Sequence, residues 1–262
     1  RIGGHSREIS MMFTDVASFT SIMERMDASV LVEHMDSYFT ILCKAVDNSQ
    51  GIVDKFVGDA VMAFWGAPDE DVDQAKGACR AALLVQQRLN DARPTWRAAG
   101  LPVLETRIGL HKGEAIVGNV GYDERFSYTA LGDSVNLASR LEGLGKQYGC
   151  NIIASHRIYE EAKDEFCFLP LDVVSVVGKK EQVRIFELSD RDLDEEVIQY
   201  IRDYEQAFAI FSSGDFSQAL PLFLRLQNSM DRPVHQVMAD RCRRFIDNPP
   251  VNWDGVWNFD SK

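Results

Sequence analysis

The sequence has few cysteines, no long apolar run and fewer basic than acidic residues. Its five cysteines lie far apart without a Cys-x-x-Cys pair, which predicts reduced thiols in a cytoplasmic protein rather than a disulfide framework. No apolar stretch reaches about 18 residues, so we expect no membrane-spanning segment in this chain. With 28 basic against 40 acidic residues, the net charge of −12 argues against nucleic-acid binding, which needs a basic face.

Phosphate-binding glycine loops and zinc-binding histidine pairs are missing as well. No glycine cluster is followed by Lys-Ser or Lys-Thr, as a P-loop ATPase requires, and the five histidines have no metal-ligand spacing. The sequence shows no signal peptide and begins at Arg1 rather than at a methionine. We therefore expect a piece of a longer protein, in which any membrane anchor would lie upstream.

Short apolar runs and helical periodicities alternate along the first 189 residues. The helical spacing predicts helices over 17–48, 71–92, 134–147 and 155–162, the third of them capped by Asp133 or Ser134. The short apolar runs predict strands over 8–16, 52–57, 60–65, 103–110, 113–120, 151–154, 166–169 and 182–188, with loops over 121–130 and from Pro94 to Pro102. This order favours an α+β sandwich, with helices on a mostly antiparallel sheet.

Residues 190–262 have a different, wholly helical character. Apolar positions at helical spacing flank a Ser-Gly-Asp break at 213–215, which predicts an α-helical hairpin resembling one tetratricopeptide-type repeat. We expect a third helix at 234–247 and a tail whose two tryptophans pack back onto the body. One such repeat cannot bury its own apolar face, so we divide the chain into a domain at 1–189 and a docked helical appendage.

Two acids stand where apolar segments end. Asp15 follows the first predicted strand, and Asp59 lies beside Gly58 at the tip of the hairpin over 52–65. Either acid alone is typical of a turn or strand end, because its side chain bonds nearby backbone N–H groups. If the hairpin pairs beside the first strand, the two carboxylates converge, and such oxygen ligands suit Mg²⁺ or Mn²⁺ bound together with a substrate phosphate.

Three blocks of sequence together resemble the catalytic domain of class III nucleotidyl cyclases. They are FTDVASFT at 13–20, KFVGDAVMAFWG at 55–66 and YTALGDSVNLASRLEG at 128–143, in the order of the family. The resemblance covers residues 7–189 and implies the cyclase homology fold, a ferredoxin-like α+β sandwich. It also implies a homodimer in which two protomers pair head to tail and share two composite active sites.

The resemblance assigns roles to five residues. Asp15 and Asp59 match the two metal-binding aspartates, and the carbonyl of Val16 would help to hold the second of two Mg²⁺ or Mn²⁺ ions. One ion would activate the ribose 3′-hydroxyl for attack on the α-phosphorus, and the other would neutralise the triphosphate. From the opposite protomer, Asn136 would orient the ribose and Arg140 would stabilise charge on the α-phosphate. Without the other blocks, the preferred interpretation of this last pair would be the exposed polar face of an ordinary amphipathic helix.

Lys55 and Thr129 match the two positions at which the family recognises the purine base of its substrate. Lys55 matches the lysine that reads the adenine ring in adenylate cyclases, where guanylate cyclases typically have Glu. Thr129 resembles the type IIIb subgroup, which includes bicarbonate-responsive enzymes. A lysine donates to the ring nitrogen of adenine and a hydroxyl can accept from its 6-amine, so the pair favours ATP over GTP. The alternative for Lys55 is a solvated strand lysine.

The stretch VVGKK at 176–180 departs from the family pattern at the triphosphate-binding lysine. Val177 aligns with that position, and Lys179, or its neighbour Lys180, would replace the lysine by a small shift. The alternative is that both are solvated turn lysines. Loss of this phosphate contact would raise the Michaelis constant for ATP more than it would change the chemistry.

The resulting prediction is a homodimeric adenylate cyclase that makes cyclic AMP and pyrophosphate from ATP, preceded in the full protein by a sensor module. A bicarbonate regulator is compatible with Thr129, as are other signals. Two alternatives are a guanylate cyclase, which Lys55 and Thr129 disfavour, and a non-catalytic nucleotide-sensing dimerisation module. A degenerate cyclase usually loses a metal Asp, the Asn or the Arg, and this sequence retains all of them.

Overall fold

A mostly antiparallel sheet organises the protein. Within residues 3–122, 125–175 and 181–259, which the computed structural model describes, nine strands form this sheet in the order β2-β3-β1-β4-β6-β8-β7-β9, with β5 also paired to β4. The strands are β1 (Gly3–Val16), β2 (Ile52–Val57), β3 (Ala60–Trp65), β4 (Thr106–Tyr122), β5 (Arg125–Leu131), β6 (Ile152–Ser155), β7 (Cys167–Ser175), β8 (Gln182–Ser189) and β9 (Trp257–Asn258). Only the pairs β4–β6 and β7–β9 of these strands are parallel, which confirms the predicted α+β class.

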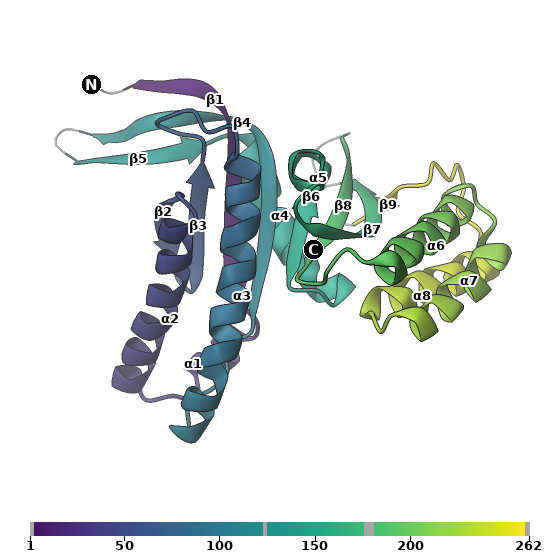
Figure 1. The fold of residues 1–262 in the computed structure, drawn as a ribbon, viewed down its shortest axis with the longest axis horizontal. Helices are drawn as coiled ribbons and strands as arrows, with labels where there is room; N and C mark the ends of the chain where they lie inside the picture. Colours follow the sequence, from purple (N-terminus) through teal and green to yellow (C-terminus); the bar gives the residue numbers. More distant parts are fainter. Residues whose placement is uncertain (1–2, 123–124, 176–180, 260–262) are drawn as a thin grey trace.

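Helices cover both faces of the sheet. They are α1 (Phe19–Met23), α2 (Ala28–Asn48), α3 (Gln74–Ala98), α4 (Asp133–Tyr148), α5 (His156–Ala162), α6 (Glu195–Ser212), α7 (Phe216–Ser229) and α8 (Pro233–Asp247). Figure 1 shows α2 and α3 side by side along strands β1 to β4. Met12 and Ala63 belong to the core under α2 and α3, whereas Met11 and Met62 face the core under α4, because side chains alternate along a strand. No helix among the described residues combines the length and apolar character needed to cross a membrane.

Two predictions about the middle of the chain are wrong. The predicted strands 103–110 and 113–120 are one continuous strand, β4, and the predicted loop over 121–130 contains β5, which pairs with β4. Gly113 does not begin a strand; it lies within β4, where α4 passes so close that a Cβ would overlap the side chain of Ser134. The glycine therefore permits a helix to pack on the sheet, which a turn-based interpretation misses.

Two helix predictions also need correction. The predicted helix 17–48 divides into α1 and α2, because the Asp27 side chain accepts a hydrogen bond from the Ser29 N–H (2.9 Å) and starts a new helix. Helix α3 continues through Pro94, which was predicted to lie in a loop. Trp96, two residues later, is only 7% exposed, so burial of the last turns offsets the hydrogen bond that proline cannot donate.

The C-terminal helices share a core with the second half of the sheet. Val174 and Ile185, on β7 and β8, lie in the same buried cluster as Phe211 of α6. The predicted helical hairpin and third helix are confirmed as α6, α7 and α8. The indole N–H of Trp253 donates to the carbonyl of Ser212 (3.0 Å), and β9 pairs with β7, so the tail packs back onto the body as predicted.

A buried ion pair fastens α8 to the sheet. The Asp172 carboxylate on β7 has no exposed surface and accepts hydrogen bonds from Arg241 of α8 and from the Tyr148 hydroxyl at the end of α4. Removing either charge would leave the other buried without a partner, which typically costs about 3–5 kcal/mol. The helical appendage is therefore held by charge as well as by apolar contact.

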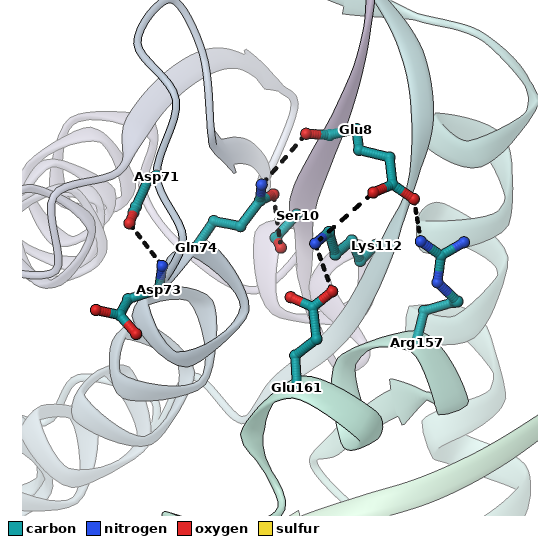
Figure 2. Close-up of polar contacts among 8 residues, drawn as sticks. All are labelled: Glu8, Ser10, Asp71, Asp73, Gln74, Lys112, Arg157 and Glu161. Atoms are coloured by element: carbon teal, nitrogen blue, oxygen red, sulfur yellow. Dashed lines mark hydrogen bonds and ion pairs between the residues drawn. The ribbon is translucent and has the colours of Figure 1, made fainter.

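A second polar cluster joins β1, β4, α3 and α5 (Figure 2). The Lys112 Nζ lies 2.5 Å from the Glu161 Oε1 and 3.9 Å from the Glu8 Oε2. Arg157 bonds the same Glu8 and lowers the pKa of that carboxyl, while Gln74 donates to the Glu8 carbonyl oxygen at 3.3 Å. These contacts satisfy a lysine that the sheet almost buries, so the cluster serves packing.

His235, buried on α8, forms part of a hydrogen-bonded chain. Arg232 donates to the Tyr200 hydroxyl (2.7 Å), which in turn donates to the His235 Nε2 (2.6 Å). The Nδ1 of the ring donates to the Gln227 Oε1 (2.8 Å), because the amide nitrogen of Gln227 is bonded to Asp231. This chain requires a neutral ring, and burial together with the Arg232 charge lowers the pKa of His235 to about 4.

We predict that acid weakens the protein through His235. The unfolded histidine binds a proton near pH 6.5, whereas the folded one does so near its lowered pKa of about 4, so stability present above pH 6.5 is lost as pH falls toward 4. The loss attributable to His235 is about 1–3 kcal/mol. Urea unfolding at pH 7 and pH 4.5 measures it: His235→Gln should show a smaller drop than the wild type. The exposed His5→Gln control should match the wild type, and an equal drop in all three proteins would contradict the prediction.

Candidate active site

A hydrogen bond joins the tip of the β2–β3 hairpin to the end of β1. Gly58 takes a positive φ of 61°, which closes a tight turn between Val57 and Ala60 and leaves Asp59 at the tip. The Asp59 Oδ2 accepts from the backbone N–H of Val16 at 2.7 Å. Since Val16 follows Asp15 directly, the two aspartates lie at one edge of the sheet, as the sequence predicts.

Two further side chains contact this pair of acids. Arg107, directly opposite Asp15 on β4, donates from Nε to the Asp15 Oδ1 at 3.2 Å. Glu142 of α4 forms a hydrogen bond with Asp15, and burial, with the Asp15 carboxylate second, raises the pKa of Glu142 to about 8. Three carboxyl groups therefore share a small region in which Arg107 is the contacting cation, and Glu142 holds a proton at neutral pH.

Neither Arg107 nor Glu142 is among the site residues predicted from the sequence. Glu142 lies within the third sequence block, but nothing in the local pattern shows that its side chain reaches β1. Arg107 becomes visible only once the register of β1 with β4 is known, because directly opposite residues share one face of a sheet. A prediction of strand pairing would have found it.

The carboxylates fit a divalent cation that also binds a substrate. Asp15 and Asp59 supply hard oxygen ligands, and burial, followed by the neighbouring Asp15 carboxylate, raises the pKa of Glu142 beside them. No group of three or more His, Cys, Asp or Glu side chains in the described ranges is arranged to hold a metal ion by itself. Mg²⁺ and Mn²⁺ sites that share substrate phosphates need only one or two protein carboxylates. The participation of the Val16 carbonyl stays a prediction.

Helix α4 presents Asn136 and Arg140 on its exposed side. The helix begins at Asp133 with Gly132 at the N-cap, so neither Asp133 nor Ser134 caps it as predicted, and Gly132 takes an extended positive-φ conformation (139°). Glu142 lies two residues beyond Arg140, about 200° around the helix. The side of α4 that faces Asp15 is therefore a different side from the one that carries Asn136 and Arg140.

The two predicted base-reading residues meet through a third side chain. Thr129 of β5 donates its hydroxyl proton to the Asp54 Oδ2 at 2.7 Å, and the Lys55 Nζ lies 3.8 Å from the Asp54 Oδ1. The structure therefore brings Lys55 and Thr129 to one place, on neighbouring parts of β2 and β5. Lys179, the predicted triphosphate ligand, and its neighbours Val177 and Lys180 lie outside the described residues.

The fold is that of a nucleotidyl cyclase catalytic domain. The chain belongs to the family of adenylate and guanylate cyclase catalytic domains, whose pattern it matches over residues 4–189. Among solved structures it is similar to the adenylyl cyclase CyaB from P. aeruginosa, with 31% identity and a TM-score of 0.68 over 74% of this chain and 99% of that one. It is equally similar in fold to the guanylyl cyclase Cya2, with 28% identity, a TM-score of 0.68, and 74% and 98% coverage.

Curated relatives carry the name adenylate cyclase. The chain is 41% identical over 182 residues to adenylate cyclase 1 of Rhizobium meliloti, covering 70% of this chain and 27% of that protein. It is 36% identical over 190 residues to an adenylate cyclase of Anabaena cylindrica, covering 70% of this chain and 37% of that protein. The chain thus spans well under half the length of these relatives.

We predict that Asp59 is needed for divalent-metal affinity. Asp59→Asn keeps an oxygen for the Val16 N–H but removes the charge, so Mn²⁺ affinity should fall about 10-fold or more. Electron spin resonance titration of Mn²⁺ in the presence of a non-cyclisable nucleoside triphosphate measures the affinity. Asp69→Asn, an exposed acid in the loop after β3, is the matched control. Equal affinities in the two variants would remove Asp59 from the metal site.

Proposed function

We propose that this domain is an adenylate cyclase that converts ATP to 3′,5′-cyclic AMP and pyrophosphate. The observation that carries the proposal is the placement of Asp59 beside Asp15 at one edge of the sheet, in a member of the cyclase family. When bound there, two Mg²⁺ or Mn²⁺ ions would supply the positive charge that lowers the pKa of the ribose 3′-hydroxyl and neutralises the triphosphate.

Other residues of the chain bind the base, orient the sugar and stabilise charge on the phosphates. Lys55 donates to the ring nitrogen of adenine and Thr129 accepts from the 6-amine. Asn136 orients the ribose so that the 3′-oxygen lies in line with the α-phosphorus, and Arg140 stabilises the charge that develops on the α-phosphate. Lys179 is proposed as a triphosphate contact. Arg107, already beside Asp15, adds a cation on the metal side of the site.

We place these groups in two protomers of a homodimer. Asn136 and Arg140 point away from the Asp15 of their own chain, because Glu142 occupies the side of α4 that faces it. The β4–β5 hairpin extends beyond the helices (Figure 1) and exposes large apolar side chains, such as Tyr122 at 67% and Ile116 at 53%. Exposed apolar surface of this kind is typical of a protein–protein interface.

ATP is favoured over GTP by the base-reading pair and by the curated relatives, which are named adenylate cyclases. The fold alone does not separate the two substrates, since the guanylyl cyclase Cya2 matches as closely as the adenylyl cyclase CyaB. The discriminating experiment supplies ATP or GTP with Mg²⁺ or Mn²⁺ and measures cyclic nucleotide and pyrophosphate, with and without bicarbonate. Cyclic GMP as the main product would replace the proposal with a guanylate cyclase, and no product at all would favour a non-catalytic module.

We predict that two inactive variants restore activity when mixed. Asp59→Asn should abolish turnover, and Arg140→Ala should lower kcat by roughly 10²–10³, the usual cost of losing one charge-stabilising donor. In an equal mixture half of the dimers are mixed, and each has one intact site, so about a quarter of wild-type activity should return. Arg80→Ala, an exposed arginine on α3, is the control for loss of a surface charge.

The outcome of this mixing experiment separates two geometries. Activity near a quarter of the wild type supports sites shared between protomers. Activity no higher than that of Arg140→Ala alone, with dimers confirmed by light scattering, would mean that each site uses Asp59 and Arg140 of one chain.

A further inference from the structure

Asp54 occupies an irregular position in β2. The register between β2 and β3 shifts there: Val53 pairs with Ala63, but Lys55 pairs with Met62, which leaves Asp54 as the extra residue of a β-bulge. Such a bulge re-aims the side chain of the extra residue. The Asp54 side chain is 1% exposed, while the Lys55 side chain beside it is 43% exposed. A carboxylate is thus buried directly behind the proposed base-reading residues.

This carboxylate contacts both strands that read the base. Its Oδ2 accepts the Thr129 hydroxyl proton at 2.7 Å and the Ala130 backbone N–H at 3.3 Å. Its Oδ1 is buried without a hydrogen-bond donor within 3.5 Å among the described residues, and the Lys55 ammonium lies 3.8 Å away. Burying a carboxylate costs free energy unless hydrogen-bond donors and cations face it. The Thr129 hydroxyl, the Ala130 N–H and the Lys55 ammonium are therefore strongly attracted to Asp54.

The bond to Asp54 determines what Thr129 can offer a ligand. A hydroxyl has one proton and two acceptor lone pairs, and an ionised carboxylate can only accept. Because the Thr129 proton is directed at Asp54, the hydroxyl faces a ligand with lone pairs alone. Adenine presents a donor at C6, the amine, whereas guanine presents an acceptor, the carbonyl. A hydroxyl free to rotate would suit either base.

We propose that Asp54 is a specificity-determining positioning residue: it fixes the Thr129 hydroxyl as an acceptor and thereby selects a 6-amino purine over a 6-oxo purine. The inference rests on the proposed function, since Thr129 must lie against the base. Asp54 itself stays behind Thr129 and acts through it. The ion pair with Lys55 adds a second restraint, because it keeps the ammonium on the same side of the base pocket.

The test compares ATP with inosine triphosphate, which has the 6-carbonyl of guanine without its 2-amino group. Asp54→Val fills similar volume but accepts no proton, so the Thr129 hydroxyl can turn and donate to a 6-carbonyl. The ratio of kcat/KM for ATP to that for inosine triphosphate should fall about 10-fold or more, mainly through KM. Asp54→Asn is the matched rescue variant, since the Ala130 N–H selects its carbonyl oxygen for the Oδ2 position and Thr129 keeps an acceptor. Its ratio should stay within about threefold of the wild type.

A Thr129→Val background shows whether Asp54 acts through the hydroxyl. In that background Asp54→Val should not change the ratio further, because no proton remains to be directed. Asp54→Ala, which adds no bulk, replaces Asp54→Val if circular dichroism shows that the valine variant does not fold. An unchanged ratio in a folded Asp54→Val or Asp54→Ala protein, or equal losses in the Asn and Val variants, would overturn the inference.

Failure of the proposed function has a different signature. A wild-type protein that makes no cyclic AMP, or that prefers GTP, removes the premise whatever the Asp54 variants do. A wild type that prefers ATP, together with Asp54 variants of unchanged preference, leaves the adenylate cyclase in place and removes only the role of Asp54.

Discussion

The hydrogen bond from the Val16 N–H to the Asp59 carboxylate ties a hairpin tip to the end of the neighbouring strand, and the acidic edge depends on it. Asp59 belongs to a turn, where side chains are usually free to move, yet this bond holds it at a backbone position set by the central strand. Arg107 holds Asp15 in the same way from the other neighbouring strand. Two strands thus aim two carboxylates at one place, and the raised pKa of Glu142 keeps a third negative charge from being added beside them.

Helix α4 connects this edge to the rest of the proposed chemistry. One side of the helix packs on the sheet through Ala138 and reaches Asp15 through Glu142, while the other side presents Asn136 and Arg140. A single helix can therefore contact Asp15 of its own chain through Glu142 and present Asn136 and Arg140 to the acids of a second copy. Gly109 of β4 allows this close packing, since a Cβ there would overlap the Glu142 nitrogen and lie only 2.5 Å from the Ala138 carbonyl oxygen of α4.

Local sequence patterns predicted the strands, helices and acids of the site better than the contacts between strands that are far apart in the sequence. Asp15 and Asp59 were predicted to converge if the hairpin pairs beside the first strand, and the hairpin, α6–α8 and most strands follow local periodicity. Gly113 was predicted to begin a separate strand because local patterns do not show that a helix crosses there. Arg107 depends on cross-strand register and Asp54 on a bulge, and neither leaves a signal in the order of residues. Pairing partners far apart in sequence are the information that composition and spacing do not contain.

β7 and β8 share one core with the last three helices. The part of the chain that folds together therefore extends beyond the part that the family pattern covers. The family pattern ends at residue 189, but Val174 and Ile185 are shielded from water by residues beyond it, and Asp172 is neutralised by Arg241. A polypeptide truncated after residue 189 would expose the apolar face of β7 and β8 and leave the Asp172 carboxylate without its cation. Such a preparation would aggregate or lose its shape, and its inactivity would say nothing about its active site.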